Sequence, residues 1–235
     1  MQTVEFSKMN LDDDDVVLDL GCGEGRHAIG LSALNARLRC VALDKNIVDV
    51  KTAQQRWREF APSADHCPLF MQADGEQLPF AENSFSKVIC SEVLEHIANY
   101  EFFLAEIQRV LKPGGLLAIS VPRAWPERIC WWLSREYHEV DGGHLRIFRE
   151  RELQGKVREL GFDLLSRHWA HALHVPYWWL RCMWWREGKQ HWLVRTYHRF
   201  LLWDLFSKPT LTRILERVLN PLMGKSVVMY FRKRP

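Results

Sequence analysis

Short aliphatic runs alternate with longer amphipathic stretches through the first half of the chain. The runs predict strands over 16–20, 39–44, 69–74, 87–92 and 116–122. The stretches between them repeat apolar residues at every third or fourth position, which predicts helices over 26–36, 46–60 and 100–111. Lys-Pro-Gly-Gly at 112–115 is expected to end the last helix and turn the chain into the next strand. This alternation predicts a doubly wound α/β fold with a parallel sheet.

The pattern changes after residue 122. A loop or short helix is expected over 123–146, followed by a helix that Gly161 closes and by strands over 162–170 and 226–233. The segment between these two strands predicts a mainly helical insertion. Within it, 211–220 carries apolar residues on one helix face, and Asn220-Pro221 is expected to end that helix.

A chain of 235 residues can close one substantial core. We therefore expect a single domain whose core comprises 10–122, 144–170 and 224–233. The remaining segments, 123–143 and 171–223, are interpreted as insertions that contact a substrate or a membrane.

Tryptophan and charge are both distributed unevenly. Ten of the 11 tryptophans fall between Trp125 and Trp203. Residues 1–122 carry 11 Lys and Arg against 18 Asp and Glu, whereas 123–235 carry 21 against 11. The two halves are therefore expected to meet different partners.

Cysteine spacing and the first residues favour a cytoplasmic protein. The six cysteines form no CxxC pair, and the acidic amino-terminal segment carries no secretion signal. No segment has the length of uninterrupted apolar sequence that a bilayer-spanning helix needs.

Three glycines, Gly21, Gly23 and Gly25, follow the first predicted strand and precede the first predicted helix. A bare backbone at a helix amino end allows a ligand to approach closely, although an ordinary tight turn uses the same residues. Arg26 stands where the dinucleotide motif G-x-G-x-x-G requires its last glycine, which disfavours NAD.

Two aspartates end the next predicted strands. Asp44 lies about twenty residues after the glycines, where a carboxylate can accept hydrogen bonds from ribose hydroxyls. Asp74 can accept from an adenine amino group, with Leu78 or Phe80 as an apolar wall. Each aspartate alone is more often a helix cap or turn residue, but together with the glycines they indicate a nucleoside site.

Four motifs now occur in order: VLDLGCGEGRH at 17–27, VALD at 41–44, ADGEQLPFAENSFSKVICSEVLEH at 73–96 and RVLKPGGLLAISVP at 109–122. In this respect the chain resembles the class I S-adenosylmethionine (SAM)-dependent methyltransferases, and more narrowly the type 11 family. The resemblance covers roughly 16–122, includes features of ubiquinone-pathway O-methyltransferases, and extends into 144–162. It implies a Rossmann-like seven-stranded sheet with an antiparallel last strand and SAM as the cofactor.

The resemblance also implies the cofactor site. Asp19, Gly21, Gly23 and Gly25 would surround the methionine moiety, Asp44 the ribose and Asp74 the adenine, while Glu92 would face the cofactor. The predicted cofactor-binding residues are completed by Cys22, Lys45 and Gly75.

Methyl transfer is an in-line displacement in which positioning and desolvation carry much of the catalysis. A hydroxyl acceptor additionally needs a base, and His96 or His144 is the candidate. Glu92, Glu95 and His96 with a later His144 also resemble a metal-assisted O-methyltransferase site. The same EVLEH segment occurs in type 11 enzymes that use no metal, so a divalent metal is the less favoured alternative.

The insertions are rich in tryptophan and arginine, and they are expected to overhang the methyl donor and select the acceptor. Their rings can enlarge the core, or they can lie at a bilayer interface with arginines toward anionic lipid. Nucleic acid is disfavoured because the basic residues are dispersed among apolar ones. We therefore predict a methyltransferase acting on a small lipophilic acceptor, with oxygen favoured, at the inner face of a membrane.

Two other classes of function remain open. The basic aromatic arm would suit an RNA or protein methyltransferase, and a non-catalytic SAM-binding membrane protein would keep the same cofactor motifs. The fourth predicted strand ends in CSEVLEH and carries no Asn-Pro-Pro-aromatic motif, which disfavours methylation of adenine N6, cytosine N4 and glutamine.

Overall fold

Seven strands form one sheet in the order β3-β2-β1-β4-β5-β7-β6 in the computed structural model, which describes residues 2–34, 37–61, 67–140, 142–207 and 209–235. Only β7 runs antiparallel to its neighbours β5 and β6. The predicted Rossmann-like fold with an antiparallel last strand is confirmed. The strands are β1 (Val16–Leu20), β2 (Arg39–Asp44), β3 (Leu69–Gln72), β4 (Phe85–Ser91), β5 (Leu111–Pro122), β6 (Phe162–Ala170) and β7 (Ser226–Lys233).

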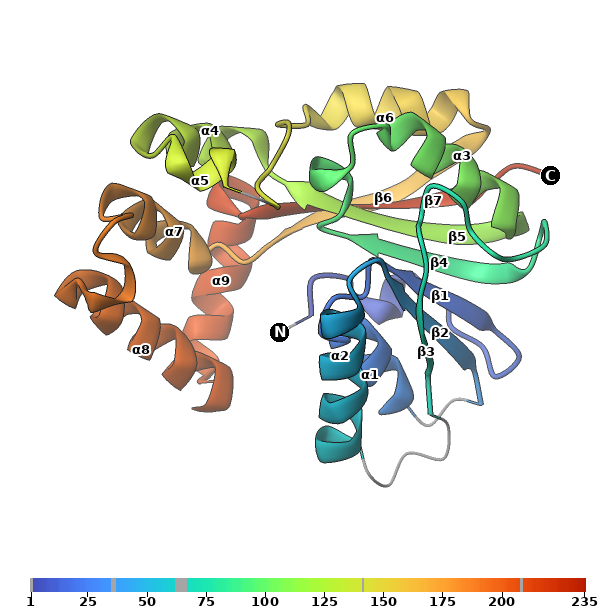
Figure 1. Ribbon diagram of the computed structural model, residues 1–235, viewed down its shortest axis with the longest axis horizontal. Helices are drawn as coiled ribbons and strands as arrows, with labels where there is room; N and C mark the ends of the chain where they lie inside the picture. Colours follow the sequence, from blue (N-terminus) through green and yellow to red (C-terminus); the bar gives the residue numbers. More distant parts are fainter. Residues whose placement is uncertain (1, 35–36, 62–66, 141, 208) are drawn as a thin grey trace.

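Helices cover both faces of the sheet (Figure 1). One face carries α3 (Tyr100–Val110) and α6 (Glu150–Glu159), and the other carries α1 (Arg26–Ser32) and α2 (Ile47–Phe60). Successive strand residues point to opposite faces, so Leu18 and Leu20 join the core under α3 while Val17 joins the core under α1. Burial on both faces explains why the central strands are apolar at almost every position.

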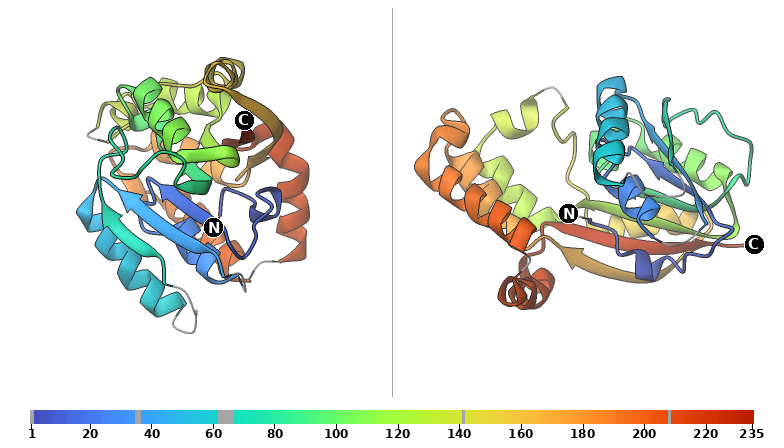
Figure 2. Two further views of the ribbon diagram at one scale, coloured as in Figure 1. Left: turned by 90° about the vertical axis from the view of Figure 1, so that its right-hand side faces the viewer. Right: turned by 90° about the horizontal axis from the view of Figure 1, so that it is seen from below.

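The helices of the two insertions gather beyond the carboxyl end of β5 (Figures 1 and 2). After β5 come α4 (Ala124–Leu133) and the short α5 (Glu136–Glu139). Between β6 and β7 come α7 (His174–Met183), α8 (Trp192–Ser207) and α9 (Thr210–Met223). Contacts join α4 to α7 and α7 to α8. Ligands of doubly wound folds bind at this end of the sheet, so the insertions lie where they can select one.

Several predicted boundaries were wrong. The helix expected over 26–36 ends at Ser32 with Ala33 as its cap, and residues 35–36 lie outside the described ranges. The third strand stops at Gln72, and the fourth begins at Phe85 and stops at Ser91. Residues 112–115 do not separate α3 from the next strand. They form an irregularity inside β5, because pairing with β4 already begins at Leu111.

The expected end of the last helix at Asn220-Pro221 was also wrong. Pro221 lies inside α9, which continues to Met223. Proline removes one donor but does not end this helix, because the carbonyls of its last turn have other partners. The Arg123 guanidinium donates to the Pro221 carbonyl over 2.9 Å, and Gly224 N–H donates to the Asn220 carbonyl over 2.9 Å.

The aromatic residues of the insertions divide between two environments. Trp131, Trp178, Trp179 and Trp185 pack around buried Cys130, Tyr137 and Cys182, which fits the expected enlargement of the core. Other large apolar side chains point outward, among them Trp132, Trp192, Trp203 and Phe206. None of the helices in the described ranges combines the length and apolar character needed to cross a bilayer.

Candidate active site

The loop between β1 and α1 presents main chain rather than side chains. Gly21 and Gly23 adopt positive φ angles of 71° and 51°. A Cβ on Gly21 would lie 2.4 Å from Val93, whereas a Cβ on Gly23 would meet no heavy atom within 4 Å. Gly21 is therefore required for packing, and Gly23 keeps the mouth of the loop open to a ligand.

Asp44 fixes this loop from the end of β2. Its carboxylate accepts from Gly23 N–H over 2.8 Å and from Asn46 N–H over 2.9 Å. Each carboxylate oxygen retains a further lone pair, so Asp44 can still accept from ribose hydroxyls as predicted.

Asp19 lies behind the glycine loop in the core, and its side chain is 1% exposed. It accepts from Ala28 N–H over 3.0 Å, and burial raises its pKa to about 7. Its described contacts hold the start of α1, and Cys22 beside it is buried as well.

Lys45, Asp74 and Gly75 form a separate group further along the edge. The Lys45 ammonium lies 2.9 Å from an Asp74 oxygen, and Glu76 N–H donates to the other oxygen over 3.0 Å. The hydrogen bond from Lys45 lowers the pKa of Asp74. A Cβ on Gly75 would lie 2.2 Å from the Phe103 ring, so this glycine permits close packing of α3.

A cavity of about 880 Å³ opens beside the glycine loop. Its walls bring together Gly21, Cys22, Gly23, Glu92, His96 and His144 from the predicted set. Within the part of the chain that the structure describes, Asp19, Gly25, Asp44, Lys45, Asp74 and Gly75 are not among the lining residues. The volume is that of a typical small-molecule site.

Glu92 follows β4 with a positive φ of 56° and projects into the cavity. Ser120 Oγ donates to one Glu92 oxygen over 2.9 Å, and the Lys225 ammonium lies 3.8 Å from the other. Lys225 directly precedes β7 and also lines the cavity. It was not predicted from the sequence, where an isolated lysine carries no pattern.

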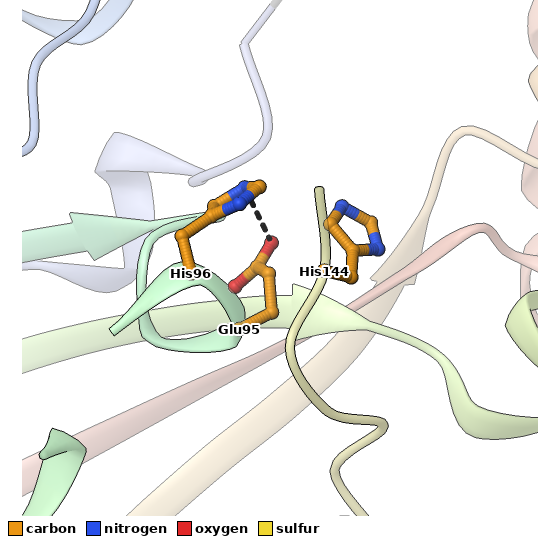
Figure 3. A group of neighbouring side chains, drawn as sticks. All are labelled: Glu95, His96 and His144. Atoms are coloured by element: carbon orange, nitrogen blue, oxygen red, sulfur yellow. Dashed lines mark ion pairs between the residues drawn. The ribbon is translucent and has the colours of Figure 1, made fainter. Parts of the chain in front are cut away.

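Three titratable side chains of the cavity wall, Glu95, His96 and His144, lie close together (Figure 3). The rings of His96 and His144 have centroids 4.9 Å apart, and Glu95 Oε1 lies 4.0 Å from His96 Nε2. Glu95 is buried, and neither of its oxygens has a hydrogen-bond partner within the described residues. Burial and then the Glu92 charge raise the pKa of Glu95 well above its ordinary value, which favours the neutral acid.

Hydrogen bonds between the two segments explain why His96 and His144 meet although they are 48 residues apart. Leu145 N–H donates to the Glu95 carbonyl over 2.8 Å, and the Arg146 guanidinium donates to the Ala98 carbonyl over 2.8 Å. His96 Nδ1 lies 3.2 Å from the Gly143 carbonyl. Burial, followed by the neighbouring His144, lowers the pKa of His96.

Glu127 of α4 orients His144. Its Oε1 lies 2.5 Å from His144 Nδ1, and its carboxylate also accepts from Trp131 Nε1 and from the Tyr137 hydroxyl. Burial acts to raise the pKa of Glu127, but the hydrogen bond and charge of His144 outweigh it and lower that pKa below its usual value. With Nδ1 engaged by a carboxylate, Nε2 is the His144 nitrogen left to accept a proton.

The sequence did not single out Glu127. It lies in an aromatic helix that shares no motif with His144, and only the tertiary packing of α4 brings the two together. The sequence offered one indication of its role, a glutamate within a largely apolar helix segment, and such a residue is rarely buried without a partner.

The same donor atoms can be considered as a metal site. One ligand atom each from Glu95, His96 and His144 lies within 4.8 Å of the others. One observation fits a metal poorly, because Glu95 favours its protonated form. The contact between His144 Nδ1 and Glu127 is compatible with either role, since a metal-binding histidine also commonly donates its second N–H to a carboxylate. The arrangement is better suited to moving a proton.

Residues 18–119 match a family model described as a methyltransferase domain. This range lies within the predicted resemblance over 16–122 and confirms it. The family match supports the predicted cofactor, SAM.

Curated relatives carry related names. A ubiquinone biosynthesis O-methyltransferase from Agrobacterium fabrum is 28% identical over 64% of this chain and 60% of that protein. A sterol 24-C-methyltransferase from Pneumocystis carinii is 33% identical over 62% of this chain and 36% of that protein. A phthiotriol/phenolphthiotriol dimycocerosates methyltransferase from Mycobacterium ulcerans is 33% identical over 60% of this chain and 48% of that protein. The chain thus spans less than two thirds of the length of these relatives.

Solved structures share the fold over nearly the whole chain. A SAM-dependent methyltransferase from Methanosarcina mazei superposes with a TM-score of 0.65 at 16% identity, covering 100% of this chain and 99% of that one. The [4+2]-cyclase SpnF superposes with a TM-score of 0.63 at 20% identity, covering 97% of this chain and 78% of that one. At these identities the likeness establishes the fold alone, and function has to be argued from the site.

Proposed function

We propose that this chain, whose residues 18–119 belong to the methyltransferase-domain family, transfers the methyl group of SAM to an oxygen of a small lipophilic acceptor at a membrane surface. The observation that carries the proposal is the cavity that joins the open glycine loop to the His144–Glu127 pair.

The residues present suit the cofactor. The open main chain at Gly23 suits close approach by the methionine moiety, and the spare lone pairs of Asp44 suit ribose hydroxyls. SAM supplies an electrophilic methyl group on a sulfonium. Glu92 and Lys225 both line the cavity, so its wall presents a carboxylate and an ammonium side by side.

His144 is the proposed base. Glu127 holds Nδ1–H, so Nε2 can accept the acceptor's hydroxyl proton as the new oxygen–carbon bond forms. The resulting imidazolium would be stabilised by the buried Glu127 carboxylate. A base is needed for an alcohol or phenol, which favours oxygen over carbon as the methylated atom. His96 contacts the His144 ring edge and lines the same wall, so it helps to position the acceptor.

Two features support a lipophilic acceptor. Trp178 lines the cavity from the insertion between β6 and β7, beside the partly buried rings of Trp131, Trp179 and Trp185. Two relatives are named a ubiquinone biosynthesis O-methyltransferase and a sterol 24-C-methyltransferase, and ubiquinone and sterols are both apolar molecules.

The exposed face of α8 supports contact with a membrane. Trp192, Arg195, Arg199, Trp203 and Phe206 are exposed and fall on one side of a helix with 3.6 residues per turn. Aromatic rings interleaved with arginines suit the headgroup region of an anionic bilayer.

α9 adds a second exposed apolar stripe. Its outward side chains include Leu211, Ile214, Leu215, Val218 and Leu222. Contiguous apolar surface of this kind mostly marks an interaction site. A lipophilic acceptor would reach the enzyme from the same bilayer.

The decisive experiment is product identification. The purified chain would be incubated with methyl-labelled SAM and a total lipid extract, with RNA and protein fractions assayed in parallel. We expect label in an apolar product as an alkali-stable ether, and none in RNA or protein. Label in RNA or in protein would show that the acceptor is that macromolecule and would contradict the proposed lipophilic acceptor. SAM binding without any methyl transfer would favour a non-catalytic SAM-binding protein.

A further inference from the structure

A second group of potential metal-ligating side chains includes two residues that line the cavity, His171 and His174. One ligand atom each from His171, His174 and Glu216 lies within 4.8 Å of the others. His171 directly follows β6, His174 begins α7 and Glu216 comes from the middle of α9. The cluster therefore joins the start and the end of the insertion between β6 and β7.

The polar atoms of this cluster are buried without adequate partners. Within the described residues, His174 Nδ1 and Glu216 Oε1 have no hydrogen-bond partner. An unsatisfied buried polar group destabilises the fold unless a water molecule or an ion occupies the site. Two residues of one cluster therefore each carry a buried polar atom without a partner, which a shared ligand would explain.

His171 is already oriented as a metal ligand would be. Its Nε2 lies 3.0 Å from Thr3 Oγ1, so the Nε2 proton can be donated there and the Nδ1 lone pair is free. Metal-binding histidines commonly hold their second nitrogen in this way. His171 is 9% exposed, so its ring has little freedom to turn.

We propose that His171, His174 and Glu216 form a binding site for a divalent transition metal, zinc being the best match. Two imidazoles and one carboxylate are a common zinc donor set. The two histidines also line the cavity, so a fourth coordination position would face it. The site is separate from Glu95, His96 and His144, and it does not depend on the proposed methyl transfer.

Metal titration of the full chain tests this site. The protein would be stripped with a chelator and titrated with Co²⁺ while visible absorption is recorded, then with Zn²⁺ in competition. We expect one equivalent with the absorption of a tetrahedral site, and a zinc-induced rise in Tm of about 5 to 10 °C at saturating metal.

Matched variants locate the ion. Glu216→Gln and His174→Gln should each weaken zinc binding by about 10- to 100-fold or more. Glu95→Gln, the matched change in the other cluster, should bind zinc as the wild type does. Unchanged affinity in both of the first two variants, or loss in Glu95→Gln alone, would overturn the assignment. Circular dichroism spectra and the Tm of each metal-free variant show whether weaker zinc binding comes from the loss of a metal ligand or from unfolding of the variant.

Discussion

His144 Nδ1 and Glu127 Oε1 lie 2.5 Å apart, although His144 belongs to the loop between α5 and α6 and Glu127 to a buried position of α4. Glu127 also accepts from Trp131 and Tyr137, so its carboxylate cannot rotate freely. The pair therefore sets both the tautomer and the direction of the His144 ring. In the proposed reaction, Glu127 is a positioning residue and His144 the catalytic one.

Glu127→Gln should impair the base without emptying the cofactor site. The amide keeps the volume and can still contact Trp131 and Tyr137, but it loses the charge that stabilises the imidazolium. General-base catalysis contributes about 10²–10⁴-fold, and we expect kcat to fall by a substantial part of that range. The affinity for S-adenosylhomocysteine should change by less than about twofold, because Glu127 has no role in the proposed cofactor site.

Steady-state kinetics and calorimetry check both halves of this prediction. The matched control is Glu136→Gln, which changes an exposed glutamate at the start of α5. The pH profile of kcat should also shift in Glu127→Gln, which a purely structural change would not produce. Unaltered kcat in a folded variant would remove the base from the mechanism.

Gly23→Ala should block the cofactor without creating a steric clash inside the protein. The new Cβ meets no protein atom within 4 Å, so it projects into open space beside the cavity. The backbone φ of 51° costs a non-glycine residue about 1–2 kcal/mol. Gly114 offers a matched control, because it has a φ of 75°, no neighbour within 4 Å and a position away from the cavity.

The two variants should therefore unfold at similar urea concentrations, both below that of the wild type. Only Gly23→Ala should lose affinity for S-adenosylhomocysteine in calorimetry, by at least about tenfold, which corresponds to ~1.4 kcal/mol. Equal affinities for the two variants would mean that the ligand does not approach this glycine.

Asp44→Ala should weaken cofactor binding by about 1–3 kcal/mol, the usual cost of losing hydrogen bonds to a charged group. Part of this loss would come from the glycine loop itself, because Gly23 N–H loses its acceptor. Asp44→Asn separates the effects, since its amide oxygen can still accept from Gly23. Calorimetry on both variants is the measurement, with Asp163→Ala on β6 as the control. Full affinity in Asp44→Ala would exclude the ribose assignment.

The sequence predicted features that local pattern determines. The strands, the glycine loop and the position of Asp44 follow from apolar periodicity and from the short distance between a strand end and the next helix. His96 and His144 were identified as a pair because the family resemblance linked their segments. Glu127, His171 and Glu216 were missed, because each acts only through packing between elements that are far apart in the chain.

Helical spacing also left the direction of an apolar face undetermined. The predicted apolar face of the helix over 211–220 comprises Leu211, Ile214, Leu215, Val218 and Leu219, and this pattern is the same whether the face contacts a core or solvent. In the structure the first four side chains are 42 to 76% exposed, whereas Leu219 is partly buried against the cluster of α7 and α8, and α9 also buries Thr212. Whether such a face is exposed depends on the elements or partners that pack against it, and the periodicity of the sequence does not identify them.

Phe206→Glu combined with Trp192→Glu should remove binding to anionic vesicles. Phe206 is 81% and Trp192 61% exposed, so neither change disturbs the core. Full burial of one such ring contributes about 1.5–3 kcal/mol, so partitioning should fall by at least tenfold. Flotation with phosphatidylserine vesicles is the assay, and Phe102→Glu on α3 is the matched control because Phe102 is also 71% exposed.

The charge component of the same face can be tested separately. Arg195→Gln with Arg199→Gln should weaken vesicle binding by about 1 kcal/mol per arginine at low salt, and high salt should remove the difference. Wild-type protein that stays with the soluble fraction at low salt would contradict the membrane proposal. A concentration-dependent dimer that the Phe206 and Trp192 changes abolish would assign the face to a second copy of the chain.

The buried imidazole of His27 should make stability fall in acid. His27 Nε2 lies 3.4 Å from the N–H groups of Thr3 and Val4, and burial, then the Arg26 charge, lowers its pKa to about 3. An unfolded histidine titrates near pH 6.5, so between about pH 6.5 and 3 the unfolded state binds the extra proton. The free energy of unfolding therefore decreases as pH falls through this window, by up to ~1.4 kcal/mol per pH unit for this one group.

His27→Gln keeps an acceptor for the two N–H groups but cannot ionise. Urea unfolding at a series of pH values should show a smaller slope in the variant than in the wild type, and parallel curves would show that His27 is not the titrating group.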